Sequence, residues 1–231
     1  MNHSVRITLA CLDLAATAVA DQGAVETAYT EAIATVGIVP GTVAGTRALA
    51  RLRESRGLPQ RDLFRALSPA GDEAWAATAE LAFERAYGSV LDRLGRIAEP
   101  GTEAALDKLS GAGIRICLLT GFSNRILSRI LDTLGWWNRA DLAISPDDVG
   151  GRGSPRPDMI LTAALKLGVD DIREVAVAAA SAPILQTARH SGASMAIALG
   201  LRSPEATHTL DSLADLPTLL LGTSPAVAGR L

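Results

Sequence analysis

The chain has 231 residues and a formal net charge of −3, and 48% of its residues are hydrophobic, mostly small and aliphatic. This length suffices for one large domain or two smaller ones with a buried core. The slight acidity argues against a protein that binds nucleic acid through clustered Lys and Arg.

The sequence also argues against membrane insertion and zinc chemistry. No apolar run reaches the roughly 18 residues of a membrane span, and the N-terminus lacks the charged and apolar regions of a signal peptide. We therefore expect a cytoplasmic protein, either monomer or homodimer, that contacts neither membranes nor nucleic acid. The three His are too scattered for a zinc site. Cys11 and Cys117 are expected to be buried, reduced thiols.

The first expected element is a short apolar run over residues 5–12, which ends at Asp13 and is typical of a buried parallel strand. Residues 24–95 then show helical periodicity interrupted by Gly and Pro, with no strand pattern. This helical insert is expected to form a cap domain over residues 22–96, and residues 1–21 and 97–231 are expected to form the core domain. The four cap helices are expected at residues 25–36, 42–55, 60–67 and 72–94.

Strands and helices alternate after residue 100, which predicts an α/β fold with a parallel sheet and helices on both faces. The further strands are expected at residues 114–119, 141–145, 174–179 and 194–199, and a short segment over residues 207–210 follows them. The further helices are expected at residues 102–112, 123–134, 158–167, 184–191 and 211–221. In such sheets ligands bind at the carboxyl ends of the strands. The insert leaves the sheet directly after the first strand, so we expect it to cover these ends like a lid.

The expected strand ends carry the candidate chemical groups. Asp13 ends the first strand and is a candidate nucleophile, and the backbone of the small residues after it could hold an anion. Thr120 and Gly121 end the next strand and would add a hydroxyl and an amide for the same anion. Each signal alone is weak, but their order around a helical insert is much more specific.

Together these features resemble the haloacid dehalogenase (HAD) superfamily, and in particular its phosphonatase-like hydrolase branch. The resemblance covers nearly the whole chain and rests on four segments, which are DLAAT at 13–17, LTGFS at 119–123, GSPRPDMI at 153–160 and the stretch 175–194. It implies a HAD-like Rossmannoid parallel sheet with a helical cap, and a hydrolase that acts on a small molecule. In that family the first Asp attacks a phosphoryl group beside a Mg²⁺ ion.

The resemblance also implies which residues form the site. Asp13 and Thr120 are the expected catalytic residues, with the Thr120 hydroxyl holding an oxygen of the substrate. The residues expected to contact the substrate from the core are Ala15, Thr17, Gly121, Ser154 and Arg156. We expect Phe64 to face the same cleft from the cap.

The sequence departs from the family where the chemistry takes place. The Gly of the first motif is Ala16, and the basic residue of the third motif is Ser154. The two acids of the fourth motif, which hold Mg²⁺ in the family, align with Ala180 and Ile184. Because Mg²⁺ needs carboxylate oxygens, we expect no metal site and no ordinary phosphatase activity. Asp13 is then the one strong chemical group expected in the site.

Three functions remain open at this point. The first is an enzyme that keeps Asp13 as nucleophile or acid–base group and acts without a metal on an organic small molecule, for instance in specialised metabolism. The second is a non-catalytic protein that binds a metabolite or a partner protein. The third is a Mg²⁺-dependent phosphatase in which the loop acids Asp147 and Asp148 replace the lost ligands, although these acids are better suited to capping a helix.

Three further residues bear on these alternatives. Arg152 and Arg156 flank Ser154 and would either supply the missing cation or remain in solvent. Gln60 stands where phosphonoacetaldehyde hydrolases carry a Schiff-base lysine, which argues against that reaction.

Overall fold

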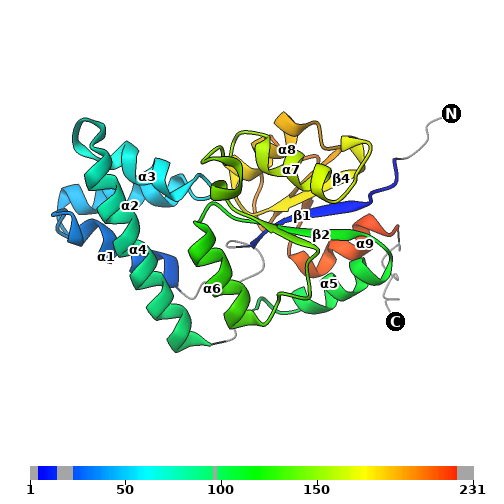
Figure 1. Ribbon diagram of the computed structural model, residues 1–231, viewed down its shortest axis with the longest axis horizontal. Helices are drawn as coiled ribbons and strands as arrows, with labels where there is room; N and C mark the ends of the chain where they lie inside the picture. The colour runs from blue at the N-terminus through cyan, green and yellow to red at the C-terminus, as the bar shows by residue number, and fades with distance from the viewer. Residues whose placement is uncertain (1–4, 15–22, 96–97, 223–231) are drawn as a thin grey trace, which may run out of the picture.

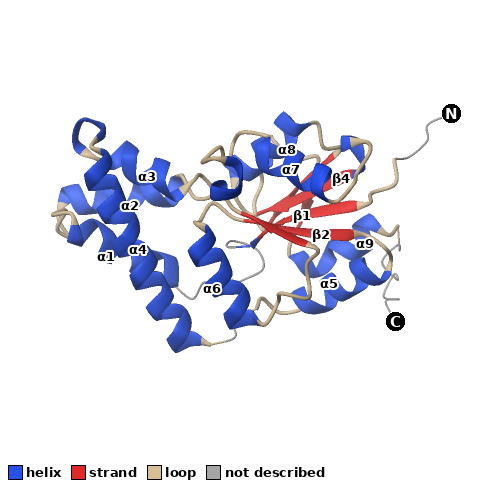
Figure 2. Cartoon of the chain, viewed as in Figure 1, coloured by secondary structure: helices blue, strands red, loops and turns tan. Residues whose placement is uncertain are grey.

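The centre of the structure is a parallel sheet with the strand order β3-β2-β1-β4-β5-β6 (Figure 2). This computed structural model describes residues 5–14, 23–95 and 98–222. The strands are β1 (Leu9–Asp13), β2 (Arg115–Leu119), β3 (Leu142–Ile144), β4 (Val175–Ala179), β5 (Met195–Leu199) and β6 (His208–Leu210). Every pair of neighbouring strands runs parallel, which confirms the predicted α/β sheet.

Helices cover both faces of the sheet (Figure 1). Because successive side chains of a strand point to opposite sides, Leu9 of β1 joins one apolar core and its neighbour Ala10 joins the other. The core around Leu9 includes residues of α7 (Asp158–Lys166) and α8 (Ala182–Ser191). The core around Ala10 includes residues of α5 (Thr102–Gly111), α6 (Asn124–Leu134) and α9 (Leu216–Leu220).

The two cysteines lie opposite each other in the centre of the sheet, Cys11 on β1 and Cys117 on β2. Both are buried and neither forms a disulfide, as predicted. Burial, together with the neighbouring Cys11, raises the pKa of Cys117 well above its ordinary value. The Cys117 thiol is therefore protonated at neutral pH and takes part in packing.

Four helices between β1 and α5 form a separate helical unit, which we call the cap (Figure 1). They are α1 (Ala24–Thr35), α2 (Val43–Glu54), α3 (Gln60–Leu67) and α4 (Glu73–Leu94). Side chains cap two of them, since Thr42 accepts a hydrogen bond from the Gly45 amide and Asp72 accepts one from the Trp75 amide. Each cap helix begins and ends within one residue of its predicted position. The exact limits of the two domains stay a prediction, because they fall at or beside residues outside the described ranges.

An aromatic cluster joins the cap to the core. Phe83 of α4 lies at its centre, with its ring centroid 4.9 Å from that of Tyr29 and 5.6 Å from that of Tyr87. Phe64 of α3 lies 6.3 Å from Phe83 on the same measure. Phe122, from the loop after β2, adds a ring from the core, 5.5 Å from Phe83. The apolar interior of the cap thus continues across the interface with the core.

Polar contacts hold the same interface further along, where α4 of the cap packs on α6 of the core. Glu84 of α4 accepts a hydrogen bond from the Ser123 hydroxyl and pairs with Arg125 at 3.5 Å. Asp92, two turns further along α4, pairs with Arg129. These contacts orient α4 on the core, although exposed ion pairs add little stability individually.

Two predicted elements differ from the structure. The helix expected over residues 211–221 is divided into a 3₁₀ turn, Leu213–Asp215, and the short α9. Pro217 lies in the first turn of α9, where its missing N–H is harmless, but a helix cannot run through this position without losing a hydrogen bond. The first strand begins at Leu9 rather than at residue 5, and Val5 is exposed.

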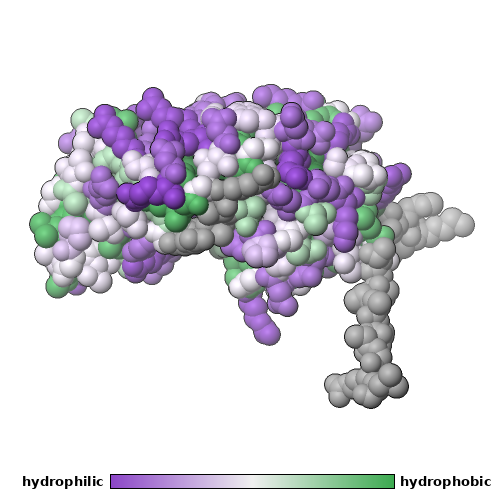
Figure 3. All heavy atoms as spheres, turned by 90° about the horizontal axis from the view of Figure 1, so that it is seen from below, coloured by the Kyte–Doolittle hydropathy of each residue, from purple (hydrophilic) through white to green (hydrophobic). Residues whose placement is uncertain are grey.

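The surface of the molecule carries both polar and apolar side chains (Figure 3). Among the described residues, no helix is both long and apolar enough to cross a membrane. Figure 3 shows hydrophilic side chains interspersed with small apolar groups over one face of the molecule. The large exposed apolar residues include Val43 on α2 and the pair Leu161 and Leu165 on α7.

We expect the substitution Phe83→Ala to lower the free energy of unfolding by about 3–5 kcal/mol, because it removes a fully buried ring and leaves a cavity among its aromatic neighbours. Chemical denaturation followed by circular dichroism measures this change. Leu165→Ala is the control, since Leu165 is 80% exposed and its loss should cost less than about 0.5 kcal/mol. Equal effects of the two substitutions would contradict the described cap core.

Candidate active site

Asp13 lies where the sequence predicts it, at the carboxyl end of β1, and is 2% exposed. The neighbouring strand β4 leads to Ser181, which is the N-cap residue of α8. The Ser181 hydroxyl donates a hydrogen bond to Oδ2 of Asp13 at 3.3 Å. Because β1 and β4 are parallel neighbours, their ends bring the carboxylate and the hydroxyl together.

Thr120 and Gly121 lie on the other side of Asp13, at the end of β2. Thr120 is fully buried, and its hydroxyl oxygen accepts a hydrogen bond from the Phe122 amide at 3.1 Å. This bond shapes the turn in which Gly121 lies. The structure therefore places both predicted residues beside the end of β1, with the Thr120 hydroxyl partly engaged by its own loop.

The segment that joins α2 to α3, residues 55–59, closes over these strand ends, and we call it the cap loop. The Gln60 amide, which follows the loop, donates a hydrogen bond to the Gly121 carbonyl at 2.9 Å. A Cβ atom at Gly121 would lie 2.5 Å from the Leu58 carbonyl oxygen, and one at Gly153 would lie 2.7 Å from the Pro59 ring. Only glycine allows the backbones to approach so closely.

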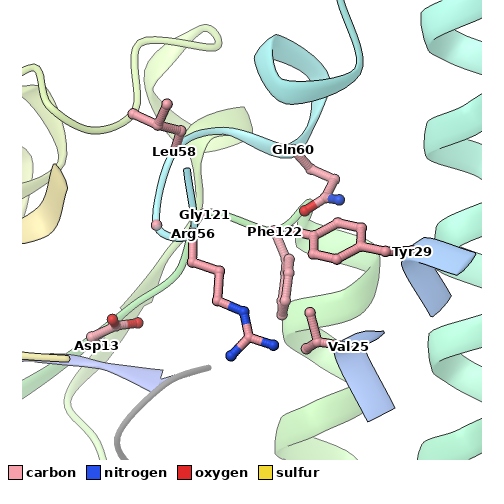
Figure 4. A pocket seen from close by; sticks show the side chains of 9 residues that line it. Asp13, Val25, Tyr29, Arg56, Leu58, Gln60, Gly121 and Phe122 are labelled. Atoms are coloured by element: carbon pink, nitrogen blue, oxygen red, sulfur yellow. The ribbon is translucent and has the colours of Figure 1, made fainter. Parts of the chain in front are cut away.

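The cap loop and the strand ends enclose a small inner cavity of about 30 Å³ around Asp13. This is room for a water-sized group. The cavity is lined by Asp13, Val25, Tyr29, Arg56, Gly57, Leu58, Gln60, Gly121 and Phe122. Figure 4 shows Arg56 reaching down from the cap loop, with its guanidinium group directed into the space between Asp13 and Val25. The sequence suggested that Asp13 is the one strong chemical group of the site. This prediction is wrong, because the Arg56 guanidinium lines the same cavity.

A wide outer groove of about 980 Å³ continues from the inner cavity between cap and core. The two spaces share Leu58, Gln60, Gly121 and Phe122 as walls. Glu80 of α4 lines the groove, and burial, reinforced by the nearby Glu84, raises the pKa of its carboxyl group. The groove has the size of a typical small-molecule site, whereas the inner cavity alone does not.

The loop around Ser154, residues 150–156, carries the third motif. It lines the outer groove and is not a wall of the inner cavity. Ser154 is 3% exposed, and its hydroxyl has no hydrogen-bond partner among the described residues. Arg156 is exposed at the rim of the groove. Arg152 is also exposed and pairs with Asp158. Among the described residues, the cation that shares the inner cavity with Asp13 is Arg56 of the cap, and not a residue of this loop.

The loop acids Asp147 and Asp148 act as helix caps. The Asp148 carboxylate accepts a hydrogen bond from the Ser145 amide at 2.8 Å and closes a capping box with it. The Asp147 carboxylate accepts one from the Asn124 amide, in the first turn of α6, at 2.8 Å. The predicted structural role of both acids is confirmed.

Of the three other predicted site residues, one lies elsewhere in the structure and two are not described. Phe64 does not face the cleft, because its ring is fully buried in the aromatic cluster of the cap, between Tyr29 and Phe83. Helical periodicity identifies the buried face of a helix but does not show whether that face packs on a core or on a ligand. Here the face that carries Phe64 packs in the core of the cap. Ala15 and Thr17 lie outside the described residues.

The described residues around Asp13 do not fit a Mg²⁺ ion. The two aligned acid positions hold Ala180 and the fully buried Ile184, whose side chain packs in the apolar core beside α8. Within the described ranges, no group of three or more His, Cys, Asp or Glu is arranged to hold a metal. The described residues place the Ser181 hydroxyl and the Arg56 guanidinium near this carboxylate, and neither replaces the carboxylates by which proteins hold Mg²⁺.

The family model of haloacid dehalogenase-like hydrolases matches residues 7–179, which is most of the chain and includes Asp13, the cap and the second and third motifs. The chain belongs to this family. No curated protein matches it in sequence. The HAD family hydrolase described here thus has the fold of its family.

Solved structures support the same fold for this HAD hydrolase. A hydrolase from Pseudomonas syringae superposes with a TM-score of 0.77 at 22% identity, covering 94% of this chain and 99% of that one. A phosphonoacetaldehyde hydrolase-like protein from Oleispira antarctica gives 0.76 at 19% identity, covering 96% and 95%. A β-phosphoglucomutase from Clostridium difficile gives 0.75 at 18% identity, covering 91% and 93%. At these identities the likeness concerns the fold and not the reaction.

We expect Gly121→Ala to loosen the cap loop, because the added methyl group collides with the Leu58 carbonyl. The Gln60 amide, which the Gly121 carbonyl protects, should then exchange with deuterium about tenfold faster or more. Gly111→Ala is the matched control, since nothing lies within 4 Å of its Cβ position. Unchanged protection of Gln60 in Gly121→Ala would show that the loop is not clamped there.

Proposed function

We propose that this protein is an enzyme that acts without a metal on an organic small molecule, with Asp13 as the group that performs the chemistry. The observation that supports this most directly is that Asp13 and the guanidinium of Arg56, which comes from the cap, line one cavity. The family's two acid positions are occupied by Ala180 and Ile184. Asp13 thus keeps its place in the fold while the groups around it differ.

The charges in the cavity favour a substrate with a single negative charge. The described lining of the cavity supplies one guanidinium, that of Arg56, and one carboxyl group, that of Asp13. A phosphate dianion would add two charges next to Asp13 without the metal and the third-motif cation that spread them in phosphoryl transfer. A carboxylate adds one charge, which the guanidinium can hold in a paired geometry.

The walls of the cavity favour an organic substrate. Val25, Tyr29, Leu58 and Phe122 present apolar or aromatic surface on the sides that Asp13 and Arg56 do not occupy. Such walls, with a few polar groups among them, are typical of sites for small organic molecules. The relatives with known structure include a β-phosphoglucomutase, and the proposal differs from that activity in the group on which Asp13 acts.

The chemistry we propose is displacement at carbon. A carboxylate oxygen of Asp13 attacks the carbonyl carbon of an ester, and the alcohol part leaves with its bonding electron pair, which gives an acid anhydride on Asp13. Water then hydrolyses this anhydride, restores the Asp13 carboxylate, releases the acid product and supplies the proton that the departing oxyanion takes up. The hydrogen bond from Ser181 orients the carboxylate, and Arg56 holds the anionic end of the substrate.

A non-catalytic binding protein is the second candidate function. The closed cap loop favours it, because the hydrogen bond between the Gln60 amide and the Gly121 carbonyl leaves only about 30 Å³ at Asp13. A Mg²⁺-dependent phosphatase has less support, since Asp147 and Asp148 cap helices. The two buried thiols are typical of a reducing compartment, so the proposal includes a cytoplasmic setting.

We expect the wild-type protein to hydrolyse p-nitrophenyl butyrate equally well in EDTA and in Mg²⁺, and to leave p-nitrophenyl phosphate intact. Asp13→Asn should lower the rate at least about 100-fold, because the amide is a poor nucleophile and a poor base. Release of p-nitrophenol measures both. Mg²⁺-dependent cleavage of the phosphate that is lost in Asp13→Asn, or an ester rate that is unchanged in that variant, would contradict the proposal, and a wild-type protein that hydrolyses neither substrate would favour the binding protein.

Arg56→Gln should remove the preference for anionic substrates. We expect kcat/KM for mono-p-nitrophenyl succinate, relative to neutral p-nitrophenyl butyrate, to fall about tenfold, which corresponds to about 1.4 kcal/mol. Arg51→Gln is the matched control, since Arg51 is exposed at the end of α2. If both variants keep the wild-type ratio, Arg56 does not bind the anion.

A further inference from the structure

Gln60 holds an unsatisfied donor in a buried place. The residue is 4% exposed, and its side-chain nitrogen Nε2 has no hydrogen-bond partner among the described residues. Figure 4 shows the carboxamide lying over the rings of Tyr29 and Phe122, on the wall of the inner cavity. A buried amide without a partner is costly in a folded protein, so such a group marks a place where another molecule supplies the partner.

The backbone of Gln60 fixes the position of this side chain. Its amide bonds to the Gly121 carbonyl at 2.9 Å, and Pro59 before it packs against Gly153. Gln60 is also the first residue of α3, so its Cα belongs to a regular element. The carboxamide is thus held at one place whenever the cap loop is closed, as a binding group must be.

Gln60 stands at the junction between the two spaces of the site. It lines both the inner cavity of about 30 Å³ and the outer groove of about 980 Å³. A substrate whose reacting group lies at Asp13 must place the rest of its body in the outer groove, because the inner cavity has no room for it. The atoms that connect the reacting group of the substrate with the rest of its body then lie beside Gln60.

We propose that Gln60 is a specificity-determining residue, whose side-chain N–H donates a hydrogen bond to an acceptor oxygen of the substrate at this junction. The substrate class is then an organic molecule with a carbonyl or carboxylate oxygen next to an apolar part, which meets Tyr29 and Phe122. A hydrocarbon at the same place leaves the donor unsatisfied and is rejected. This inference rests on the proposed function in taking the cavity around Asp13 as the substrate site.

Two nearly isosteric ligands, acetophenone and α-methylstyrene, test the inference, since they differ in a carbonyl oxygen that replaces a methylene group. Their dissociation constants are measured by ligand-observed NMR titration of the full chain. We expect the wild-type protein to bind acetophenone about tenfold more tightly, the effect of one buried hydrogen bond. Gln60→Met, which keeps the length of the side chain, should bring the ratio close to one.

Gln60→Glu supplies a second variant, in which a carboxylate faces the carbonyl oxygen, and acetophenone should then bind more weakly than α-methylstyrene. The matched control is Gln186→Met, because Gln186 is half-buried on α8 and lines neither space; it should keep the wild-type ratio. A wild-type protein that binds neither ligand or does not discriminate, or a Gln60→Met variant that keeps the preference, overturns the inference.

The experiment separates this inference from the proposed function, because it measures binding and not turnover. We expect Asp13→Asn to keep the tenfold preference, whatever its effect on hydrolysis. Loss of hydrolysis with intact selectivity supports both proposals. Selectivity that persists while Asp13→Asn leaves hydrolysis unchanged supports Gln60 alone and overturns the chemical role of Asp13.

Discussion

The hydrogen bond from the Gln60 amide to the Gly121 carbonyl, 2.9 Å long, holds the cap loop against the core, and the site depends on this contact. Glycines make it possible, since a side chain at Gly121 or Gly153 would collide with the loop. Gly57 completes the fit, because its φ of +93° suits glycine and a Cβ there would strike the Ser181 hydroxyl. With the loop seated in this way, Arg56 and Gln60 reach the cavity around Asp13.

The charged groups that surround Asp13 differ from those that the family places there, and one of them, Arg56, belongs to the cap loop. In the family, a metal and a basic residue of the core compensate the charge of the first Asp and its substrate. Here the described residues offer a guanidinium from the cap, while Ala180 and Ile184 occupy the acid positions and Ile184 packs into the apolar core. Among the described residues, the cation that lines the cavity of Asp13 therefore belongs to the cap loop.

Much of the fold could be predicted from the sequence, because apolar runs and helical periodicity report burial directly. The ends of β1 and β2 placed Asp13 and Thr120 correctly, since parallel strands bring their carboxyl ends to one edge. Arg56 and Gln60 could not be found in this way. Arg56 lies in the cap loop and Gln60 follows it, and the position of this loop is decided by contacts with Gly121 and Gly153, far away in the sequence. Phe64 was misplaced because periodicity does not distinguish the cap core from the cleft.

We propose that the reaction at Asp13 depends on the Arg56 guanidinium of the cap loop and not on a metal ion. Isothermal titration of Mg²⁺ into the full-length wild-type protein tests it most directly, with Asp13→Asn as the reference. We expect no saturable binding of Mg²⁺ to either protein at millimolar concentrations, since a single carboxylate beside a guanidinium is a poor site for this ion. Saturable binding in the wild-type protein that is lost in Asp13→Asn would contradict it.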